Sequence, residues 1–310
     1  MLCRLPVAIA AISLVVLAPR PAATQAVSQV TVPLIVQANR PFVILTFHKP
    51  DGTTRTARFL LDTGGGGFLI TEPLARELGL TWGAPSSEEG TQLAVVTNTP
   101  TVSVGNFPLT LTPERTIVML GRDNTLPAAT TVKSEGMLPG HVLSQYEVVF
   151  DYPGRTLTIA MPNTLTHAGA GMRMPVGSRS GFPRTEVMIG DSTYAMLLDT
   201  GASFTMVSET VLEALGAQHP DWERHTGAFG EAALLGGQTL ETMFVPGGIW
   251  GSQTLPRFGV VSQQAGTFER YMSQMMAAPI VGSLAGNVLK GFRVDLDYPH
   301  QMLYLTPAGR

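Results

Sequence analysis

The sequence has little cysteine and little charge, and each shortage excludes a class of protein. Of its 310 residues, 14% are charged, the formal net charge is −3, and the single cysteine is Cys3. One thiol cannot build a disulfide framework, so stability has to come from a large apolar core. A weakly acidic chain without a run of Lys or Arg has no electrostatic footprint for nucleic acid, so we expect no nucleic-acid partner.

Motifs for metal binding and for common nucleophiles are also missing. The sequence contains no HExxH or similar spacing, and no G-x-S-x-G marks a serine nucleophile. The glycines at 64–67 are not followed by the Lys and Ser or Thr of a phosphate loop. The histidines are scattered, at positions 48, 141, 167, 219, 225 and 300. We therefore expect no metal site and no cofactor.

Residues 1–26 have the pattern of an export signal. A basic start at Arg4 precedes an apolar stretch over 5–18 and a segment of small residues that ends near Ala26. The apolar stretch is short for a membrane span. We therefore expect cleavage, a periplasmic or secreted protein, and no stable membrane insertion. The alternative is an anchor formed by the uncleaved segment.

The chain does contain one motif twice. FLLDTGGGGFLI at 59–70 and MLLDTGASFTMVS at 196–208 share the letters LLDTG, which place Asp62 and Asp199 at the ends of two apolar runs. A single Asp before glycine at a strand end is usually a turn residue. Two such turns with apolar neighbours on both sides predict two partly buried carboxylates that share one role.

Two short helices are predicted at matching places in the two halves. Thr71 and Ser208 are good N-cap residues, and each is followed by a glutamate that suits the first turn of a helix. Gly79 and Gly216 stand where these helices should end.

Each half also closes with a predicted hairpin. YEVVFDYPGRTLTI at 146–159 and FRVDLDYPHQMLYL at 292–305 both have the pattern of a strand, a turn with proline and a second strand. We interpret Asp151 and Asp297 in these hairpins as turn residues. The sequence thus predicts a mostly β protein in which one unit is used twice.

The repeated aspartates suggest a specific chemistry. If the two halves face each other about a pseudo-twofold axis, Asp62 and Asp199 meet at that axis. Two carboxylates in contact hold one proton between them at moderate pH. The ionised group can take a proton from a shared water while the other donates to a carbonyl oxygen, which hydrolyses an amide.

The residues beside the aspartates would support this pair. Gly64 and Gly201 lack a Cβ, so chain and substrate can approach the carboxylates closely. Thr63 and Thr200 would hydrogen-bond across the interface and fix the geometry.

With these motifs the sequence resembles the aspartic peptidases, specifically bacterial retropepsin-like or pepsin-like aspartyl proteases with two DTG lobes in one chain. The resemblance covers about residues 30–308. It implies a bilobal, mostly β fold of two related β-barrel-like lobes, at 27–162 and 163–310, with a cleft between them. It also implies an endopeptidase that cleaves peptide or protein substrates through a water activated by both aspartates, with a monomer sufficient for the site.

Further elements of the family have candidates here. GMLPG at 136–140 and PIVG at 279–282 look like the hydrophobic-hydrophobic-Gly element beside the active-site loop, with Pro139 in place of the expected glycine. A flap over the cleft would come from 88–96 or 226–234. The glycines that would give these flaps a mobile tip are Gly90, Gly227 and Gly230.

The sequence departs from pepsin-like enzymes after each DTG. Gly65 and Ala202 stand where those enzymes carry hydroxyl donors to the aspartates. Without these donors the ionised form is less stabilised, so we expect activity at mildly acidic to neutral pH. The glycine run and Pro139 leave open an alternative, a catalytically inactive two-lobed module that binds peptides. A glycosidase-like pair is disfavoured, because it needs carboxyls about 5 Å or more apart in unlike surroundings.

Overall fold

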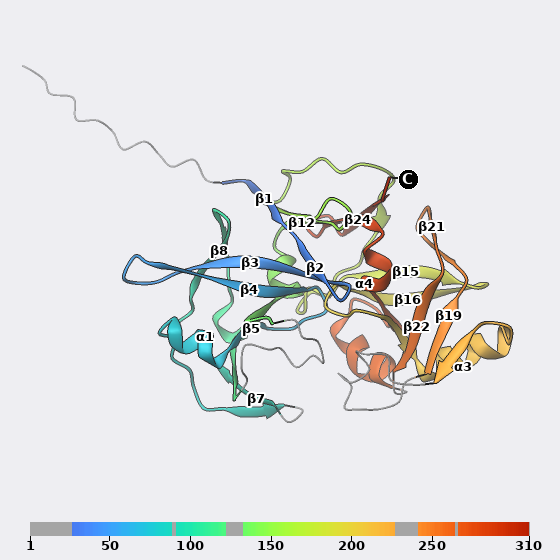
Figure 1. Ribbon diagram of the computed structural model, residues 1–310, viewed down its shortest axis with the longest axis horizontal. Coiled ribbons are helices and arrows are strands. Elements are labelled where there is room, and N and C mark those ends of the chain that lie inside the picture. Colours follow the sequence, from blue (N-terminus) through green and yellow to red (C-terminus); the bar gives the residue numbers. More distant parts are fainter. Residues whose placement is uncertain (1–26, 89–90, 122–132, 227–240, 264–265, 310) are drawn as a thin grey trace, which may run out of the picture.

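The computed structural model describes residues 27–88, 91–121, 133–226, 241–263 and 266–309, and these residues form a mostly β protein (Figure 1). The predicted export signal lies outside them, so its cleavage and the localisation of the protein stay predictions. Within the described residues, no helix is long and apolar enough to cross a membrane.

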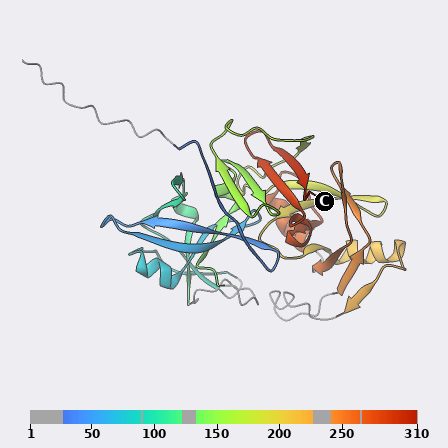
Figure 2. The ribbon, with the colours of Figure 1, turned by 45° about the horizontal axis from the view of Figure 1, so that its top comes forward.

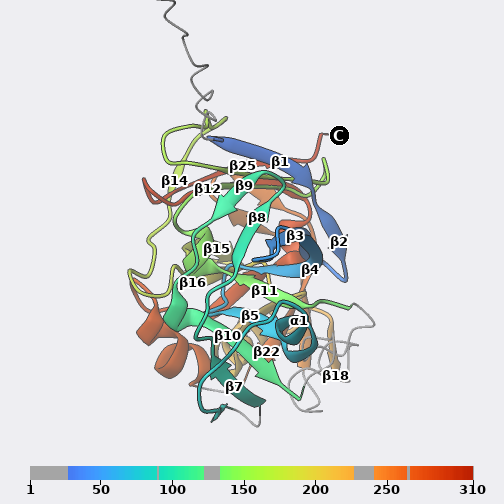
Figure 3. The ribbon, with the colours of Figure 1, turned by 90° about the vertical axis from the view of Figure 1, so that its left-hand side faces the viewer.

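Strands from the first half of the chain form a large sheet, drawn in blue to green in Figure 1. Figure 3 shows its middle strands one below the other, in the order β3, β4, β11, β5 and β10. The full order is β6 (Ser86–Glu88), β7 (Thr91–Val95), β10 (Thr116–Leu120), β5 (Phe68–Thr71), β11 (Gly136–Pro139), β4 (Thr54–Asp62), β3 (Arg40–His48), β8 (Thr101–Val104) and β9 (Phe107–Leu109), with β2 (Ile35–Gln37) paired to β3.

Strands from the second half form a second sheet, drawn in yellow to red in Figure 1. Its order is β18 (Arg224–Thr226), β19 (Glu241–Val245), β22 (Phe258–Gln263), β17 (Thr205–Ser208), β23 (Gly282–Ala285), β16 (Ser192–Asp199), β15 (Arg184–Ile189), β20 (Gly248–Trp250) and β21 (Gln253–Leu255). Strand for strand, this order matches that of the first sheet. The parallel pairs also correspond: β4 with β11 and β5 with β10 in one sheet, and β16 with β23 and β17 with β22 in the other.

A third sheet joins the two halves. The predicted hairpins at 146–159 and 292–305 are confirmed, and their strands β12 and β24 pair antiparallel from Glu147↔Asp297 to Asp151↔Arg293. Figure 2 shows the two hairpins, green and red, side by side. The strand order is β1 (Gln29–Pro33), β13 (Thr156–Ala160), β12 (Glu147–Asp151), β24 (Phe292–Asp297), β25 (Met302–Pro307) and β14 (Met172–Arg173).

Both hairpin aspartates are turn residues, as predicted. Asp151 Oδ1 accepts a hydrogen bond from the Gly154 amide at 2.7 Å, and Asp297 Oδ1 accepts one from the His300 amide at 3.2 Å. These bonds satisfy amides that the tight turn leaves without a ladder partner.

The short helices partly follow the prediction. They are α1 (Glu72–Glu77), α2 (Gly140–Leu143), α3 (Glu209–Gln218) and α4 (Gly286–Leu289), with 3₁₀ turns at Pro113–Arg115 and Met272–Met275 and a π turn at Thr267–Tyr271. Ser208 caps α3 by accepting from the Val211 amide, whereas Thr71 occupies the N-cap of α1 without a side-chain cap bond. Gly79 follows α1 with a φ of 68°, which suits a residue without a Cβ.

The prediction for Gly216 was wrong. This glycine lies inside α3, which continues to Gln218. A Cβ at Gly216 would lie 1.0 Å from the guanidinium at the end of the flexible Arg224 side chain, which would have to move aside for a larger residue.

The apolar core explains why the DTG strands end where they do. Phe59 and Leu61 of β4 and Leu198 of β16 are fully buried, and they belong to one continuous cluster that also includes Val148 and Leu296 of the joining sheet. The apolar runs before each DTG are therefore strands covered on both faces. Each of these strands runs through the apolar core and ends at its aspartate.

Candidate active site

Asp62 and Asp199 occupy the same position in two equivalent strands. Each is the last residue of its strand, β4 or β16, and both side chains are half-buried. Each strand is flanked on one side by a parallel strand, which is β11 or β23. The two carboxyls lie close enough that each changes the pKa of the other. The repeated motif thus brings together two carboxyls from opposite halves of the chain.

The flanking strands correct the prediction about Pro139. Pro139 is the register partner of Asp62, and Ala285 is the partner of Asp199, so Pro139 corresponds to Ala285 and replaces no glycine. The matching glycines come one residue later, at Gly140 and Gly286. The segment beside Asp199 is thus 282–286, not PIVG at 279–282, because the parallel register decides which residues lie opposite each other.

Two threonines connect the DTG loops by reciprocal hydrogen bonds. The Thr63 amide donates to Thr200 Oγ1 at 3.1 Å, and the Thr200 amide donates to Thr63 Oγ1 at 3.0 Å. Each hydroxyl then donates to a carbonyl of the opposite strand, Thr63 to Leu198 at 2.5 Å and Thr200 to Leu61 at 2.8 Å. Because both threonines are fully buried, these bonds fix the position of one aspartate relative to the other.

The glycines after the threonines lie against the opposite aspartate. A Cβ on Gly201 would lie 2.3 Å from Asp62 Cγ, and a Cβ on Gly64 would lie 3.1 Å from Asp199 Cγ. The first of these distances is too short for any side chain. Gly201 is therefore needed so that the two carboxyls can come together, whereas a side chain at Gly64 would require its neighbours to shift by a few tenths of an ångström.

The two aspartates differ in the amides that face them. Asp62 Oδ1 accepts from the Gly64 amide at 2.9 Å, while the Gly65 amide donates to the backbone oxygen of Asp62. Asp199 Oδ1 accepts from both Gly201, at 2.9 Å, and Ala202, at 3.1 Å. Amide donors stabilise a carboxylate. The negative charge is therefore better accommodated on Asp199.

Burial raises the pKa of both aspartates. For Asp62, burial and then the negative charge of Asp199 raise the pKa, and the Gly64 amide opposes them. For Asp199, burial raises the pKa, and the Ala202 and Gly201 amides oppose it. A pair that resists ionisation in this way retains one proton at moderate pH, and the amide count places that proton on Asp62.

A buried arginine near the pair is a residue that the sequence analysis missed. Arg40 begins β3 with 8% of its surface exposed, and its positive charge lowers the pKa of both aspartates. Its position at the head of the apolar run RPFVIL gave no signal, because only the folded chain brings it to residues 62 and 199.

Two buried tyrosines from the hairpin turns were also missed. Burial raises the pKa of Tyr152, and so does the charge of Asp199; burial and the charge of Asp62 do the same for Tyr298. Neither hydroxyl has a hydrogen-bond partner among the described residues. The DYP motifs therefore place a phenol near the opposite half's aspartate as well as forming a turn.

The β2–β3 hairpin fastens the first half to the second DTG loop. Its turn residues Ala38 and Asn39 have φ values of 51° and 61°. Ser203 Oγ donates to the Ala38 carbonyl at 2.5 Å, and Asn39 Nδ2 donates to the Ser203 carbonyl at 3.3 Å. Lys290 Nζ donates to Asn39 Oδ1 at 3.1 Å. The site is thus built from both halves.

The predicted flap segments are only partly described. β6 and β7 form a hairpin whose last pair is Glu88↔Thr91, and β18 and β19 pair at the equivalent edge of the second sheet. The tips fall outside the described residues, and with them Gly90, Gly227 and Gly230. The flap role of these glycines stays a prediction.

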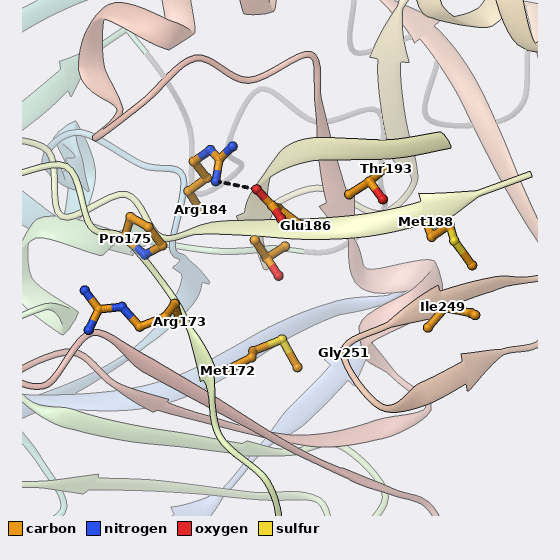
Figure 4. Close-up of a pocket in the computed structure, with 10 residues that line it drawn as sticks. Met172, Arg173, Pro175, Arg184, Glu186, Met188, Thr193, Ile249 and Gly251 are labelled. Atoms are coloured by element: carbon orange, nitrogen blue, oxygen red, sulfur yellow. Dashed lines mark hydrogen bonds and ion pairs between the residues drawn. The ribbon is translucent and has the colours of Figure 1, made fainter. Parts of the chain in front are cut away.

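A cavity of about 520 Å³ lies elsewhere (Figure 4). It is lined by residues of β14, β15 and β20 and by Thr193 near the start of β16, and an ion pair between Arg184 and Glu186 lies beside it. Neither aspartate is among its lining residues.

Comparison with protein families agrees with this geometry for the second half of the chain. The family model described as Aspartyl protease matches residues 185–247, which include Asp199 and its threonine and glycine but not Asp62. No curated protein matches the chain. The match supports an aspartyl protease family.

Proposed function

We propose that this protein is an aspartic-type endopeptidase that hydrolyses peptide bonds with a water activated between Asp62 and Asp199. The observation that carries the proposal is the pair of carboxyls, one from each half, locked together by the Thr63 and Thr200 hydrogen bonds and held at raised pKa. The family match around Asp199 supports the same activity.

The proposed fold is bilobal, with each large sheet as the framework of one lobe, at 27–162 and 163–310, and the third sheet joining them. The identical strand order of the two large sheets supports an internal duplication. We place the substrate between the lobes, under flaps formed by the β6–β7 and β18–β19 hairpins. An exported monomer suffices, because one chain supplies both aspartates.

The unequal amide contacts assign a role to each aspartate. Asp199 begins as the carboxylate and takes a proton from water while the water oxygen bonds to the peptide carbonyl carbon. Asp62 begins protonated and donates its proton to the carbonyl oxygen, which gives a gem-diol. Asp199 then protonates the amide nitrogen as the C–N bond breaks, and Asp62 recovers a proton from a gem-diol hydroxyl. Both groups return to their starting states.

The expected pH range follows from the loop composition. The residues after each DTG, Gly65 and Ala202, supply no hydroxyl donor to the carboxylates, and burial raises both pKa values. A singly protonated pair therefore persists to higher pH than it would with such donors. We propose activity at mildly acidic to neutral pH.

One of the two features that favour the alternative function, an inactive peptide-binding module, no longer supports it. It rested on Pro139 and on the glycines after the first DTG. The strand register places Gly140 where a glycine is expected, so Pro139 no longer counts against an intact site.

A transition-state mimic separates the two functions. A statine-type peptide carries a hydroxyl on a tetrahedral carbon, as the gem-diol does, and its deoxy analogue is the matched control. By calorimetry we expect the statine peptide to bind at least about a hundredfold more tightly than its analogue, and the difference to disappear in Asp62→Asn. Equal binding of both peptides to the folded wild-type chain would indicate the inactive module.

A further inference from the structure

A second group of titratable side chains lies in the joining sheet. Glu147 of β12 and Asp295 and Asp297 of β24 have side chains only 2%, 4% and 6% exposed. Arg293 forms an ion pair with Asp295, at 3.0 Å between Nε and Oδ1. Among the described residues, Arg293 is the only Lys or Arg paired with these three carboxylates, and it also pairs with Asp151. Backbone amides at Glu147, and His300 beside Asp297, offset part of the buried charge, and a bound cation would offset more of it.

A buried histidine points into this group. The His167 side chain is 7% exposed, and its ring stacks on Tyr304 with centroids 4.7 Å apart. Its Nδ1 lies 3.3 Å from Asp295 Oδ2. Its Nε2 has no hydrogen-bond partner among the described residues, but lies 4.0 Å from Glu147 Oε1 and 3.8 Å from Asp297 Oδ2.

This is the usual environment of a metal-bound histidine. Such a histidine directs one ring nitrogen at the ion and gives the N–H of the other to a carboxylate, which fixes the tautomer and the ring orientation. Asp295 is placed to accept from His167 Nδ1 and is itself held by Arg293. The geometry points to a divalent cation site of the zinc type, with Glu147, His167, Asp297 and His300 as ligands.

The distances suit this cation. Ligand atoms about 2.0–2.2 Å from a tetrahedral zinc ion are about 3.4 Å from one another. The two contacts of His167 Nε2, at 4.0 and 3.8 Å, are about half an ångström longer than that value, so the ligands would move slightly inward to bind the ion, and ligand atoms of Glu147, Asp297 and His300 lie within 4.8 Å of one another. The His300 Nδ1 lies 2.9 Å from both Asp297 oxygens. Because the His300 side chain is half exposed, the cation could reach the site from solvent at this residue.

The site would also hold the segment that connects the two halves. Glu147 accepts from the amides of Asn163, Thr164 and Leu165, at 3.1, 3.1 and 2.7 Å, and His167 follows in the same segment. Ligands from β12, from this segment and from the turn after β24 would then share one ion. We therefore assign the cation a structural role, in which it stabilises the junction and does not take part in hydrolysis.

The ligand spacing explains why no sequence motif marks this site. Glu147, His167 and Asp297 are far apart in the chain, and only Asp297 and His300 form a short pattern, within the DYPH turn. The expectation of no metal site rested on local motifs, which cannot detect ligands that a sheet brings together.

Zinc binding by the full-length chain tests the proposal. The purified protein is freed of metal with a chelator, then titrated with zinc chloride by calorimetry and by thermal unfolding. We expect one zinc ion per chain and a rise in melting temperature, because an ion that binds only the folded state stabilises it. A folded wild-type chain that binds no zinc, or whose melting temperature zinc leaves unchanged, would overturn the proposal.

Variants distinguish this site from adventitious binding. His167→Gln and His300→Gln should each weaken zinc binding by about tenfold or more. Because His300 is half exposed, its variant should fold even if the His167 variant does not. His225→Gln is the control, since His225 is an exposed histidine paired with Glu223 outside the group. Equal zinc affinity in His300→Gln, His225→Gln and wild type would contradict the proposal.

Discussion

At the scale of single residues, the two aspartates share a motif but not an environment. The Asp199 carboxyl accepts hydrogen bonds from two backbone amides and the Asp62 carboxyl from one. The difference lies in the Gly65 amide, which donates to the backbone oxygen of Asp62 and not to its carboxyl. This difference decides which carboxyl keeps the proton. It could not be predicted from the sequence, because Gly65 and Ala202 both have the amide that could have donated.

The raised pKa of Asp62 predicts that neutralising it stabilises the fold. The pKa of Asp62 is higher in the folded state than its value of about 3.9 in the unfolded state. Its protonated carboxyl therefore contributes fully to stability below about pH 3.9, and this contribution is lost as the pH rises through the folded pKa. Asp62→Asn removes the ionisable group. At pH 7 we expect its free energy of unfolding to exceed that of wild type by roughly 1–3 kcal/mol, and the gain to vanish below about pH 4.

Denaturant unfolding at several pH values measures this difference. Asp51→Asn is the control, because Asp51 has its pKa lowered by hydrogen bonds from Thr53, and its replacement should bring no gain at pH 7. A less stable Asp62→Asn at pH 7 would mean that the carboxylate is well accommodated in the folded protein.

The charge of Arg40 predicts a shift of the pH–activity profile. Arg40 lowers the pKa of both aspartates, so Arg40→Gln should raise both values. The singly protonated pair then exists over a higher pH range, and both limbs of the profile of kcat/KM should move upward. Arg40→Lys keeps the charge and should leave the profile close to that of wild type. A profile that stays in place in Arg40→Gln would remove Arg40 from the electrostatics of the site.

At the scale of elements, the two DTG loops act as one unit. Thr200 Oγ1 accepts from the Thr63 amide and donates to the Leu61 carbonyl, all within the core. Thr200→Val keeps the shape but leaves both groups unpaired, at about 1–3 kcal/mol each. We expect a loss of roughly 2–5 kcal/mol in the free energy of unfolding. Thr200→Ser retains the hydroxyl and should lose far less; equal losses would indicate a packing effect.

The loop glycines are not equivalent, and this predicts different tolerance to alanine. A Cβ at Gly201 would meet Asp62 Cγ at 2.3 Å, whereas a Cβ at Gly66 has nothing within 4 Å. Gly201→Ala should displace the Asp62 carboxyl and reduce cleavage by about a hundredfold or more, since a shift of about 1 Å has that effect. Gly66→Ala should cleave as wild type does. Similar activity in both folded variants would show that the carboxyls do not need this close approach.

The elements show what local patterns can and cannot predict. Gly79 ends its helix because a backbone with positive φ is a local property that glycine signals. Gly216 is a glycine in the equivalent position, but α3 continues past it to Gln218, so the same residue type does not end this helix. In the same way, the hairpins were predictable, whereas the pairing of β12 with β24 was not, because it joins segments far apart in the chain.

At the scale of the whole molecule, the two DTG strands have the same place in two sheets of identical strand order. That one unit is used twice stays a prediction. The sequence did not predict how the halves are joined. Arg40, the Asn39 turn and the cluster around His167 all act between segments distant in sequence, and no periodicity or motif marks such contacts.

The most direct test of the account is cleavage of a peptide library by the purified full-length chain between about pH 3 and pH 8, beside Asp62→Asn and Asp199→Asn. The account predicts cleavage by wild type in the mildly acidic to neutral range and a loss of at least about a thousandfold in each variant, with the fold of both retained. Full activity in either variant, or no cleavage by a folded wild-type chain, would contradict it.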